Sequence, residues 1–270
     1  MELSKRNSII SHPIEIQYFP FFPNFMKYIL QNSSPKLLLK LYQCCKYFYF
    51  KSKITIAPNV WFDHKEKEIE FKFFVDNGKN FFYRAYPNIE KLWLCDMLRI
   101  YSISDTILIG NVFFNKIYRN NLKELSITTL FTSFKELEIL SKSPNLTEIE
   151  LLTCVKNENG QPIPIEEIMV LFPNMKTFKI SPTHFTLESF EKLLKFKFLS
   201  KINSMGFWMV KTEFDPISMC KFLRETFEDD AEFLITFGFD SHHLRQQFLP
   251  RVKEIINGWE TKKLKRTFFC

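Results

Sequence analysis

Apolar residues recur with a helical period in the first part of the chain. From Leu37 to Phe50 the polar residues Lys40, Gln43 and Lys46 are spaced three apart. Positions three apart share one side of a helix, so this stretch is predicted to be a helix with a narrow polar stripe. A helix that covers a single core usually keeps a wide solvated face. The pattern therefore indicates apolar contacts on two sides, with its own core and with a partner protein, although a deeply buried helix fits the same periodicity.

The period changes to two further along the chain. Apolar side chains alternate from Ile69 to Val75, and more aromatic residues follow up to Ala85. Between them stands the sequence Asp-Asn-Gly-Lys at 76–79. Because Asn-Gly suits a tight primed turn, this region is predicted to form a β-hairpin.

A phrase with the pattern apolar-x-x-apolar-x-apolar recurs after the predicted hairpin. Its clear copies are residues 87–94, 120–127, 144–151 and 173–180, and a weaker copy is 198–202. The asparagines of the four clear copies lie 33, 24 and 29 residues apart. Irregular spacing of this size resembles that of leucine-rich repeats, in which a short strand alternates with a helix.

Helix signals lie between the copies of the phrase. Ser133 and Glu136 form a capping box, residues 164–171 open with proline and two glutamates, and Asp215 precedes Pro216. A last helix is expected to start at Ser241 and to end at Gly258. This alternation favours a mostly parallel, curved sheet backed by helices.

The N-terminal part resembles the F-box, in the degenerate form found in expanded animal families such as those of nematodes. The residues that carry the resemblance are Phe22, Pro23, Met26, Ile29, Leu30, Pro35, Leu38, Leu39, Leu41, Cys45 and Phe48. Phe22 stands where the family opens on leucine, and the acidic residue often found soon after the proline is missing. The resemblance covers about a sixth of the chain, and its spacing matches better than its identities.

The two resemblances together imply an α/β fold class, with an N-terminal three-helix F-box-like module followed by a short irregular leucine-rich-repeat-like solenoid. The expected divisions are a loose lead at 1–15, the helical module at 16–58 and a substrate-recognition domain at 59–270. The F-box resemblance implies that its eleven residues contact a Skp-type adaptor and, through it, a cullin scaffold. The chain would then be the non-catalytic substrate-recognition subunit of a Skp-cullin-F-box ubiquitin ligase. The alternative is a leucine-rich-repeat scaffold for protein-protein interaction with no ubiquitin link.

The expected repeat geometry also places a binding surface for a protein substrate. Residues between the apolar positions of each phrase point away from the helices, because side chains alternate along a strand. The residues predicted to bind the substrate are Lys91, Trp93, Glu124, Ser126, Glu148, Glu150, Thr177 and Lys179. Trp93 is the expected anchor, since tryptophan is a common hot-spot residue. Packing of Trp93 beneath the preceding hairpin is an equal alternative.

Composition and charge restrict the function further. The chain has 270 residues, 46% of them hydrophobic, and a net charge of +7. Residues 1–60 carry +6, residues 245–270 carry +5 and the middle carries −4. Basic ends attract nucleic acid, but no nucleic-acid-binding signature accompanies them, so nucleic acid is not expected as a partner. An acidic protein partner suits the basic N-terminal segment equally well.

Candidate chemistry is sparse. The six cysteines form no Cys-x-x-Cys pair, so neither a disulfide framework nor a metal site is expected. His242 and His243 are neighbours, and neighbours in a helix point about 100° apart, so they do not act on one atom together. Nucleophile, phosphate-loop and zinc-protease motifs are missing, so we expect neither an enzyme nor a cofactor. Without a signal peptide or an apolar run of membrane length, we expect the chain to be intracellular, cytoplasmic or nuclear, and not bound to a membrane.

Overall fold

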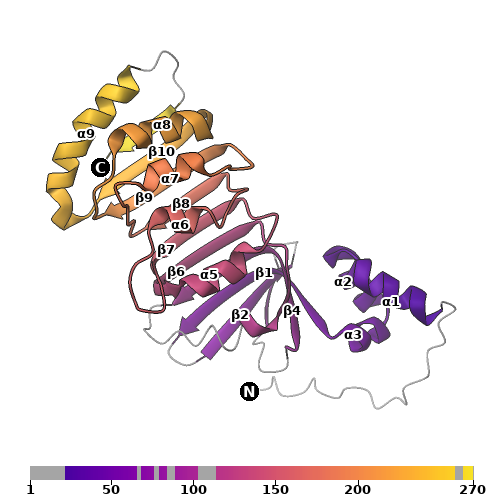
Figure 1. The fold of residues 1–270 in the computed structure, drawn as a ribbon. Helices are drawn as coiled ribbons and strands as arrows, with labels where there is room; N and C mark the ends of the chain where they lie inside the picture. Colours follow the sequence, from indigo (N-terminus) through magenta and orange to yellow (C-terminus); the bar gives the residue numbers. More distant parts are fainter. Residues whose placement is uncertain are drawn as a thin grey trace. The chain divides into compact units, whose positions relative to one another are not determined.

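The computed structural model describes residues 22–65, 68–75, 79–83, 89–102, 114–258 and 264–269. The chain divides between Lys53 and Ile54 into two compact units, Met1–Lys53 and Ile54–Cys270. The expected lead at 1–15 lies outside the described residues. Ile54–Pro58, which the sequence assigned to the first module, belongs to a strand of the second unit. Figure 1 shows the elements of both units.

The described residues of the first unit, 22–53, form three short helices, α1 (Pro23–Asn32), α2 (Pro35–Cys44) and α3 (Lys46–Ser52). Proline opens α1 and α2, where its missing N–H costs nothing, and the Ser34 hydroxyl caps α2 by accepting from the Leu37 N–H at 3.2 Å. The prediction of one continuous helix from Leu37 to Phe50 is wrong. Cys45 has extended backbone angles (φ −155°, ψ 122°) and separates α2 from α3, so the apolar surface is divided between two helices.

The second unit is built on one eleven-stranded sheet. Its strands are β1 (Ile54–Lys65), β2 (Glu68–Val75), β3 (Lys79–Tyr83), β4 (Lys91–Ser102), β5 (Ile117–Asn120), β6 (Glu124–Ser133), β7 (Glu148–Lys156), β8 (Thr177–Ser181), β9 (Ile202–Val210), β10 (Phe227–Phe237) and β11 (Leu264–Phe269). The helices of this unit are α5 (Phe134–Ser141), α6 (Ile165–Met169), α7 (Ser189–Lys195), α8 (Pro216–Thr226) and α9 (His242–Asn257), with 3-10 turns at Phe114–Lys116 and Phe239–Ser241.

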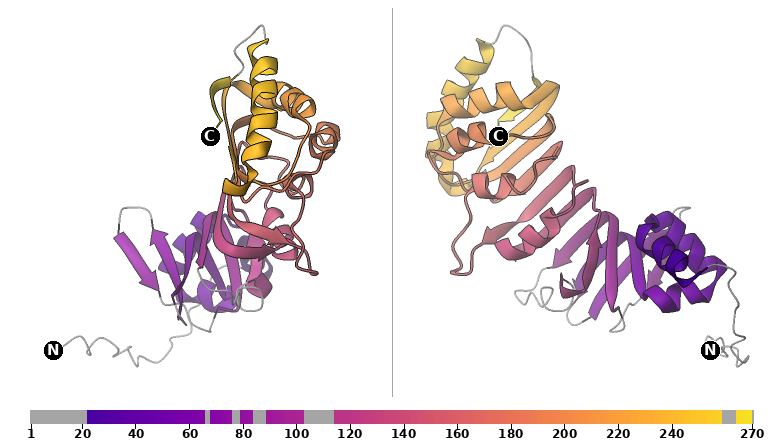
Figure 2. Two further views of the ribbon diagram at one scale, coloured as in Figure 1. Left: turned by 90° about the vertical axis from the view of Figure 1, so that its left-hand side faces the viewer. Right: turned by 45° about the vertical axis from the view of Figure 1, so that its right-hand side comes forward.

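The strand order across the sheet is β11-β10-β9-β8-β7-β6-β4-β1-β2-β3, with β5 paired to β4 beside this path. Each pair of neighbours in the series β1, β4, β6, β7, β8, β9, β10 and β11 is parallel. The pairs β1-β2 and β2-β3 are antiparallel. Right-handed crossovers that always advance in one direction place their helices on the same face of a sheet. Figure 2 shows α5, α6, α7 and α8 on one face of the strands, which leaves the other face without these helices.

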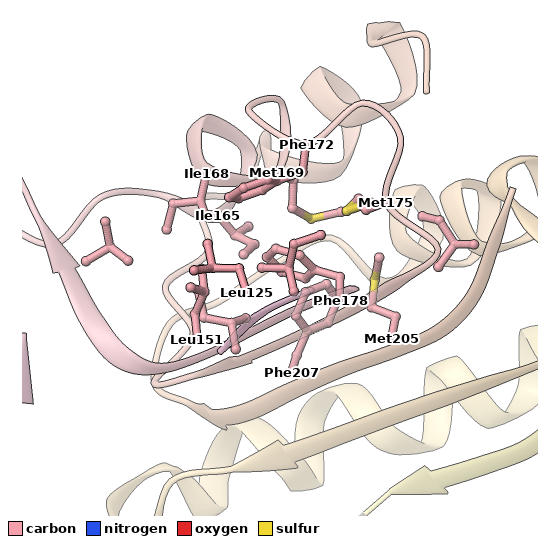
Figure 3. Packing of buried hydrophobic residues seen from close by; sticks show 14 of the residues in the cluster. Leu125, Leu151, Ile165, Ile168, Met169, Phe172, Met175, Phe178, Met205 and Phe207 are labelled. Atoms are coloured by element: carbon pink, nitrogen blue, oxygen red, sulfur yellow. The ribbon is translucent and has the colours of Figure 1, made fainter. Parts of the chain in front are cut away.

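The core lies between the sheet and its helices. Alternate residues of the strands point into it, among them Leu125, Leu151, Phe178 and Phe207, each at most 1% exposed. They meet apolar side chains from α6 and the loop that follows it, as Figure 3 shows for Ile165, Ile168, Met169, Phe172 and Met175. Towards the C-terminal end the core is rich in phenylalanine, with the rings of Phe214 and Phe248 stacked at 4.8 Å.

The expected architecture, an N-terminal three-helix F-box-like module followed by a leucine-rich-repeat-like solenoid, is wrong. The second unit instead forms one largely parallel α/β sheet, in which eight of the described strands run parallel as neighbours and helices follow the strands. The strands vary from 4 to 12 residues, an antiparallel hairpin opens the sheet, and β5 pairs beside β4. Strand-helix alternation is common to every parallel α/β sheet, so the recurring phrase located strands without establishing a repeat family.

Several local predictions are confirmed. β2 and β3 pair antiparallel, as the alternation from Ile69 predicted, although the turn residues 76–78 lie outside the described residues. The capping box of Ser133 and Glu136 opens α5, and Leu137 and Leu140 are buried. The Asp215 carboxylate caps α8, and α9 ends at Gly258. Pro250 lies inside α9, and the helix continues past it.

Candidate functional site: two exposed surfaces

The three helices of the first unit expose several large apolar side chains. We call these side chains together the helical surface and define it by residues that are 46% to 83% exposed: Phe22, Phe25, Tyr28, Leu37, Tyr49 and Phe50. Phe22 is 83% exposed and Phe50 66%. Exposed apolar side chains gathered on so small a unit are typical of a surface that binds another protein.

The residues predicted to contact an adaptor divide into two groups. Met26, Leu38 and Phe48 are buried, so they offer no surface to an adaptor. Phe22 and Pro23 are exposed, while six others are half-buried: Ile29, Leu30, Pro35, Leu39, Leu41 and Cys45. The sequence missed Phe25, Tyr28, Leu37, Tyr49 and Phe50. Their signal was the excess of apolar residues over what three short helices bury, but the motif spacing drew attention to other positions.

A second surface lies on the face of the sheet opposite α5, α6, α7 and α8, which we call the open face. Backbone pairing aligns Ser126, Glu150 and Lys179 in one row across β6, β7 and β8. Glu124, Glu148 and Thr177 form the neighbouring row on the same strands. Six of the eight residues predicted to bind a substrate are therefore brought together in two rows on the open face. Their buried neighbours Leu125, Ile149 and Phe178 point the other way, into the core.

Lys91 and Trp93 lie apart from these rows. Met97 and Arg99 of β4, rather than Lys91 and Trp93, pair with Glu124 and Ser126. The reason is that β4 is longer than the phrase predicted: its first residues pair with β5, an irregularity follows Leu94, and only its later half pairs with β6. The first copy of the phrase therefore has the right pattern in the wrong register.

Trp93 is 4% exposed, so it is buried rather than displayed. Its indole N–H donates to the Asn121 side-chain oxygen at 2.8 Å, and the Arg119 guanidinium lies 4.6 Å from the centre of its ring. Trp93 is therefore not an exposed anchor, and these contacts are made by Asn121 and by Arg119 of β5, not by the preceding hairpin. Lys91 is exposed and its ammonium lies 5.5 Å from the centre of the Tyr118 ring.

Carboxylates dominate the two rows of the open face. The Arg99 guanidinium reaches Glu124 Oε1 through Nη2 at 2.7 Å and Nε at 3.1 Å, which neutralises that carboxylate. The Ser126 hydroxyl donates to Glu150 Oε2 at 3.0 Å, which orients the carboxylate but leaves its charge. Within the part of the chain that the structure describes, neither Glu148 nor Glu150 has an ion-pair partner.

An aromatic side chain that the sequence did not single out stands beside the charged rows. Trp208 of β9 is half-buried, two residues after Gly206 on the same face. A Cβ built on Gly206 would lie 3.2 Å from Cζ2 of Trp208 and 3.6 Å from Cγ of Lys179. The missing side chain of Gly206 thus gives the indole room to lie against the sheet beside the aliphatic part of Lys179. A glycine inside an apolar strand was the only sequence signal for this close approach.

The second unit also holds a buried carboxylate on its helical side. Glu166 of α6 is 4% exposed and accepts from the Ser189 hydroxyl at 2.5 Å, the Thr186 hydroxyl at 3.0 Å and the Lys192 ammonium at 3.3 Å. Burial raises the pKa of Glu166, but hydrogen bonds from Ser189, its own backbone, Thr186 and Lys192 outweigh burial and bring the pKa below its ordinary value. This cluster joins α6 to the start of α7.

Reactive groups are few among the described residues. Burial raises the pKa of the Cys95 and Cys220 thiols to about 12, so both are protonated and poor nucleophiles. The residues that the structure describes contain no group of three or more His, Cys, Asp or Glu side chains arranged to hold a metal ion. His243 is exposed at the start of α9. The most developed chemistry of the described chain is therefore that of its two exposed surfaces.

Among the helices within the described ranges, none combines the length and the apolar character that crossing a membrane requires. Comparisons with protein-family models, with curated proteins and with solved structures found no match.

Proposed function

We propose that this chain is a non-catalytic receptor that joins two proteins, one on the helical surface and one on the open face. The partner on the helical surface is a Skp-type adaptor that belongs to a cullin ubiquitin ligase, and the partner on the open face is the protein substrate. Transfer of ubiquitin is then carried out by other subunits, in the cytoplasm or the nucleus, and the chain needs neither a cofactor nor nucleic acid.

The observation that carries the proposal is the exposed apolar side chains of the helical surface. Phe22 and Phe50 are 83% and 66% exposed. Fully covering one such side chain contributes about 1.5–3 kcal/mol to binding. The choice of adaptor comes from the resemblance of residues 22–48 to the F-box, and no feature of the fold identifies the adaptor. The charge of +6 over residues 1–60 adds attraction to an acidic partner.

Coexpression with a Skp-type adaptor tests the proposal. Wild-type chain should copurify with the adaptor, and Leu37→Asp combined with Phe50→Asp should abolish copurification while circular dichroism shows an unchanged fold. Both positions are exposed, whereas Leu38 is fully buried and aspartate there would disrupt the unit. Leu199→Asp is the matched control, because Leu199 is 65% exposed and lies in the second unit.

Two results would count against the proposal. One is a wild-type chain that does not bind the adaptor, and the other is a Leu37→Asp, Phe50→Asp variant that retains it.

The second candidate function is an α/β scaffold that binds a partner with no ubiquitin link, and the open face supports it because that face needs no adaptor to be accessible. Under this alternative the chain should be monodisperse when expressed alone, whereas an uncovered helical surface should promote aggregation that the adaptor suppresses.

A further inference from the structure

Two rows of residues on the open face carry a net charge opposite in sign to that of the whole chain. We follow these two rows from β4 to β10: Met97, Glu124, Glu148, Thr177, Ser204 and Glu232 in one, and Arg99, Ser126, Glu150, Lys179, Gly206 and Leu234 in the other. These rows carry four glutamates against one lysine and one arginine, in a chain with a net charge of +7. An acidic face on a basic protein favours a basic partner.

The two rows also differ in character from the β7 side to the β9 side. At the β7 side, Glu148 and Glu150 lack an ion-pair partner among the described residues, and Ser126 holds Glu150 in place. At the β9 side, Trp208 lies against Gly206 with the aliphatic part of Lys179 beside it. The β7 end of the rows, with its two carboxylates, suits a guanidinium or ammonium group of a partner. The β9 end suits an apolar side chain of the partner, because Lys179 disfavours a further cation next to Trp208.

The separation of the two ends fits an extended peptide. Glu150, Lys179 and Gly206 pair in sequence across three adjacent strands. Strands lie about 4.8 Å apart, so Glu150 and Gly206 are separated by about 10 Å. An extended chain in the polyproline II conformation has three residues per turn and advances about 3.1 Å per residue, so side chains three positions apart point to the same side and lie about 9 Å apart.

We propose that the open face binds an extended protein segment in which arginine or lysine lies over Glu148 and Glu150 and an apolar residue three positions away lies over Trp208. The inference rests on the proposed function, because it names the class of substrate that the open face takes. The occupant is a basic and apolar segment of another protein, and the charge of the face excludes an acidic one.

Fluorescence anisotropy with labelled synthetic nonapeptides tests this inference on the 270-residue chain. The probe carries Arg-Arg-Ser-Gly-Phe in a Gly-Ser background, and two comparison peptides carry glutamate for both arginines or serine for phenylalanine. The probe should bind, the glutamate peptide should not, and the serine peptide should bind more weakly. Affinity for the probe should fall as salt is raised, because the arginines are screened.

Variants of the chain assign the binding to this face. Glu148→Gln combined with Glu150→Gln should weaken binding of the probe about fivefold or more, from the loss of two charge pairs. Trp208→Ala should weaken it about tenfold or more, as expected for an aromatic anchor. The control for these variants is Glu138→Gln combined with Glu191→Gln. It removes the same charge from α5 and α7, on the opposite face of the same sheet, and should leave the affinity for the probe within about twofold.

The inference is overturned if the probe does not bind at about 1 mM, which corresponds to negligible affinity. It is equally overturned if the glutamate peptide binds as well as the probe, or if the helical-side control weakens binding as much as the open-face variant. Adaptor copurification is measured without these peptides. Copurification without peptide binding therefore refutes only the substrate class, and peptide binding without copurification refutes only the adaptor.

Discussion

Replacing Glu166 with alanine should destabilise the second unit by about 3 kcal/mol. The carboxylate accepts from the hydroxyls of Ser189 and Thr186, and Ser189 is fully buried. A hydrogen bond to a charged group contributes about 1.5–3 kcal/mol, and a buried donor left without an acceptor costs about 1–3 kcal/mol. The pair with Lys192 adds little, because half of the Lys192 side chain is exposed to solvent.

Unfolding by urea and unfolding by heat, both followed by circular dichroism, measure this loss. In a unit of this size, a loss of about 3 kcal/mol lowers the Tm by about 6–12 °C. Glu166→Gln keeps the shape and one acceptor oxygen, so we expect a smaller loss, of about 1–2 kcal/mol. Glu167→Ala is the matched control: this neighbouring glutamate is exposed, and its variant should stay within about 0.5 kcal/mol of wild type. Equal stability of the Glu166 and Glu167 variants would refute the reasoning.

The same carboxylate makes stability depend on pH in a definite direction. The folded-state pKa of Glu166 lies below its ordinary value of 4.5, so the unfolded chain binds this proton more readily than the folded chain. Its contribution is therefore complete above pH 4.5 and is lost as the pH falls through the lower, folded-state pKa. The difference in unfolding free energy between wild type and Glu166→Gln should shrink below pH 4.5. A difference that grows towards acid pH would contradict this assignment.

Two further predictions concern other polar side chains of the second unit. Thr153→Val should lower the free energy of unfolding in urea by about 1–2 kcal/mol, because the buried Thr153 hydroxyl is hydrogen-bonded to the hydroxyls of Thr129 at 2.8 Å and Thr132 at 3.0 Å. An unchanged urea midpoint would show that this cluster contributes nothing to stability. Asp215→Ala should cost about 1 kcal/mol by removing the cap that accepts from the N–H groups of Ile217 and Ser218, whereas Asp240→Ala, at an exposed position, should have little effect on the melting temperature.

Local structure was predictable wherever one short stretch contains the whole cause. The capping box at Ser133 and the cap at Asp215 depend on residues at most three positions apart, and both were correct. The strand phrase also located β6, β7 and β8, and the rows of Glu124, Glu148 and Thr177 followed from simple alternation. These features need no knowledge of the rest of the chain.

The failures depend on contacts that are distant in sequence. Trp93 was misplaced because β5 pairs with the start of β4, and no pattern near residue 93 reports that pairing. Trp208 was missed because its exposure follows from the space above Gly206 and from Lys179 on the neighbouring strand. The fold class failed for a related reason, since alternating strands and helices do not distinguish a repeat family from a single parallel sheet.

The strand order from β4 through β6 to β11 follows the order of the chain, so each strand-helix unit lies next to the units that precede and follow it in sequence. A molecule arranged in this way can gain or lose an internal unit without rerouting the remaining chain. The breadth of its open face is therefore open to evolutionary change by duplication or deletion, while the chemistry of each surviving row is kept.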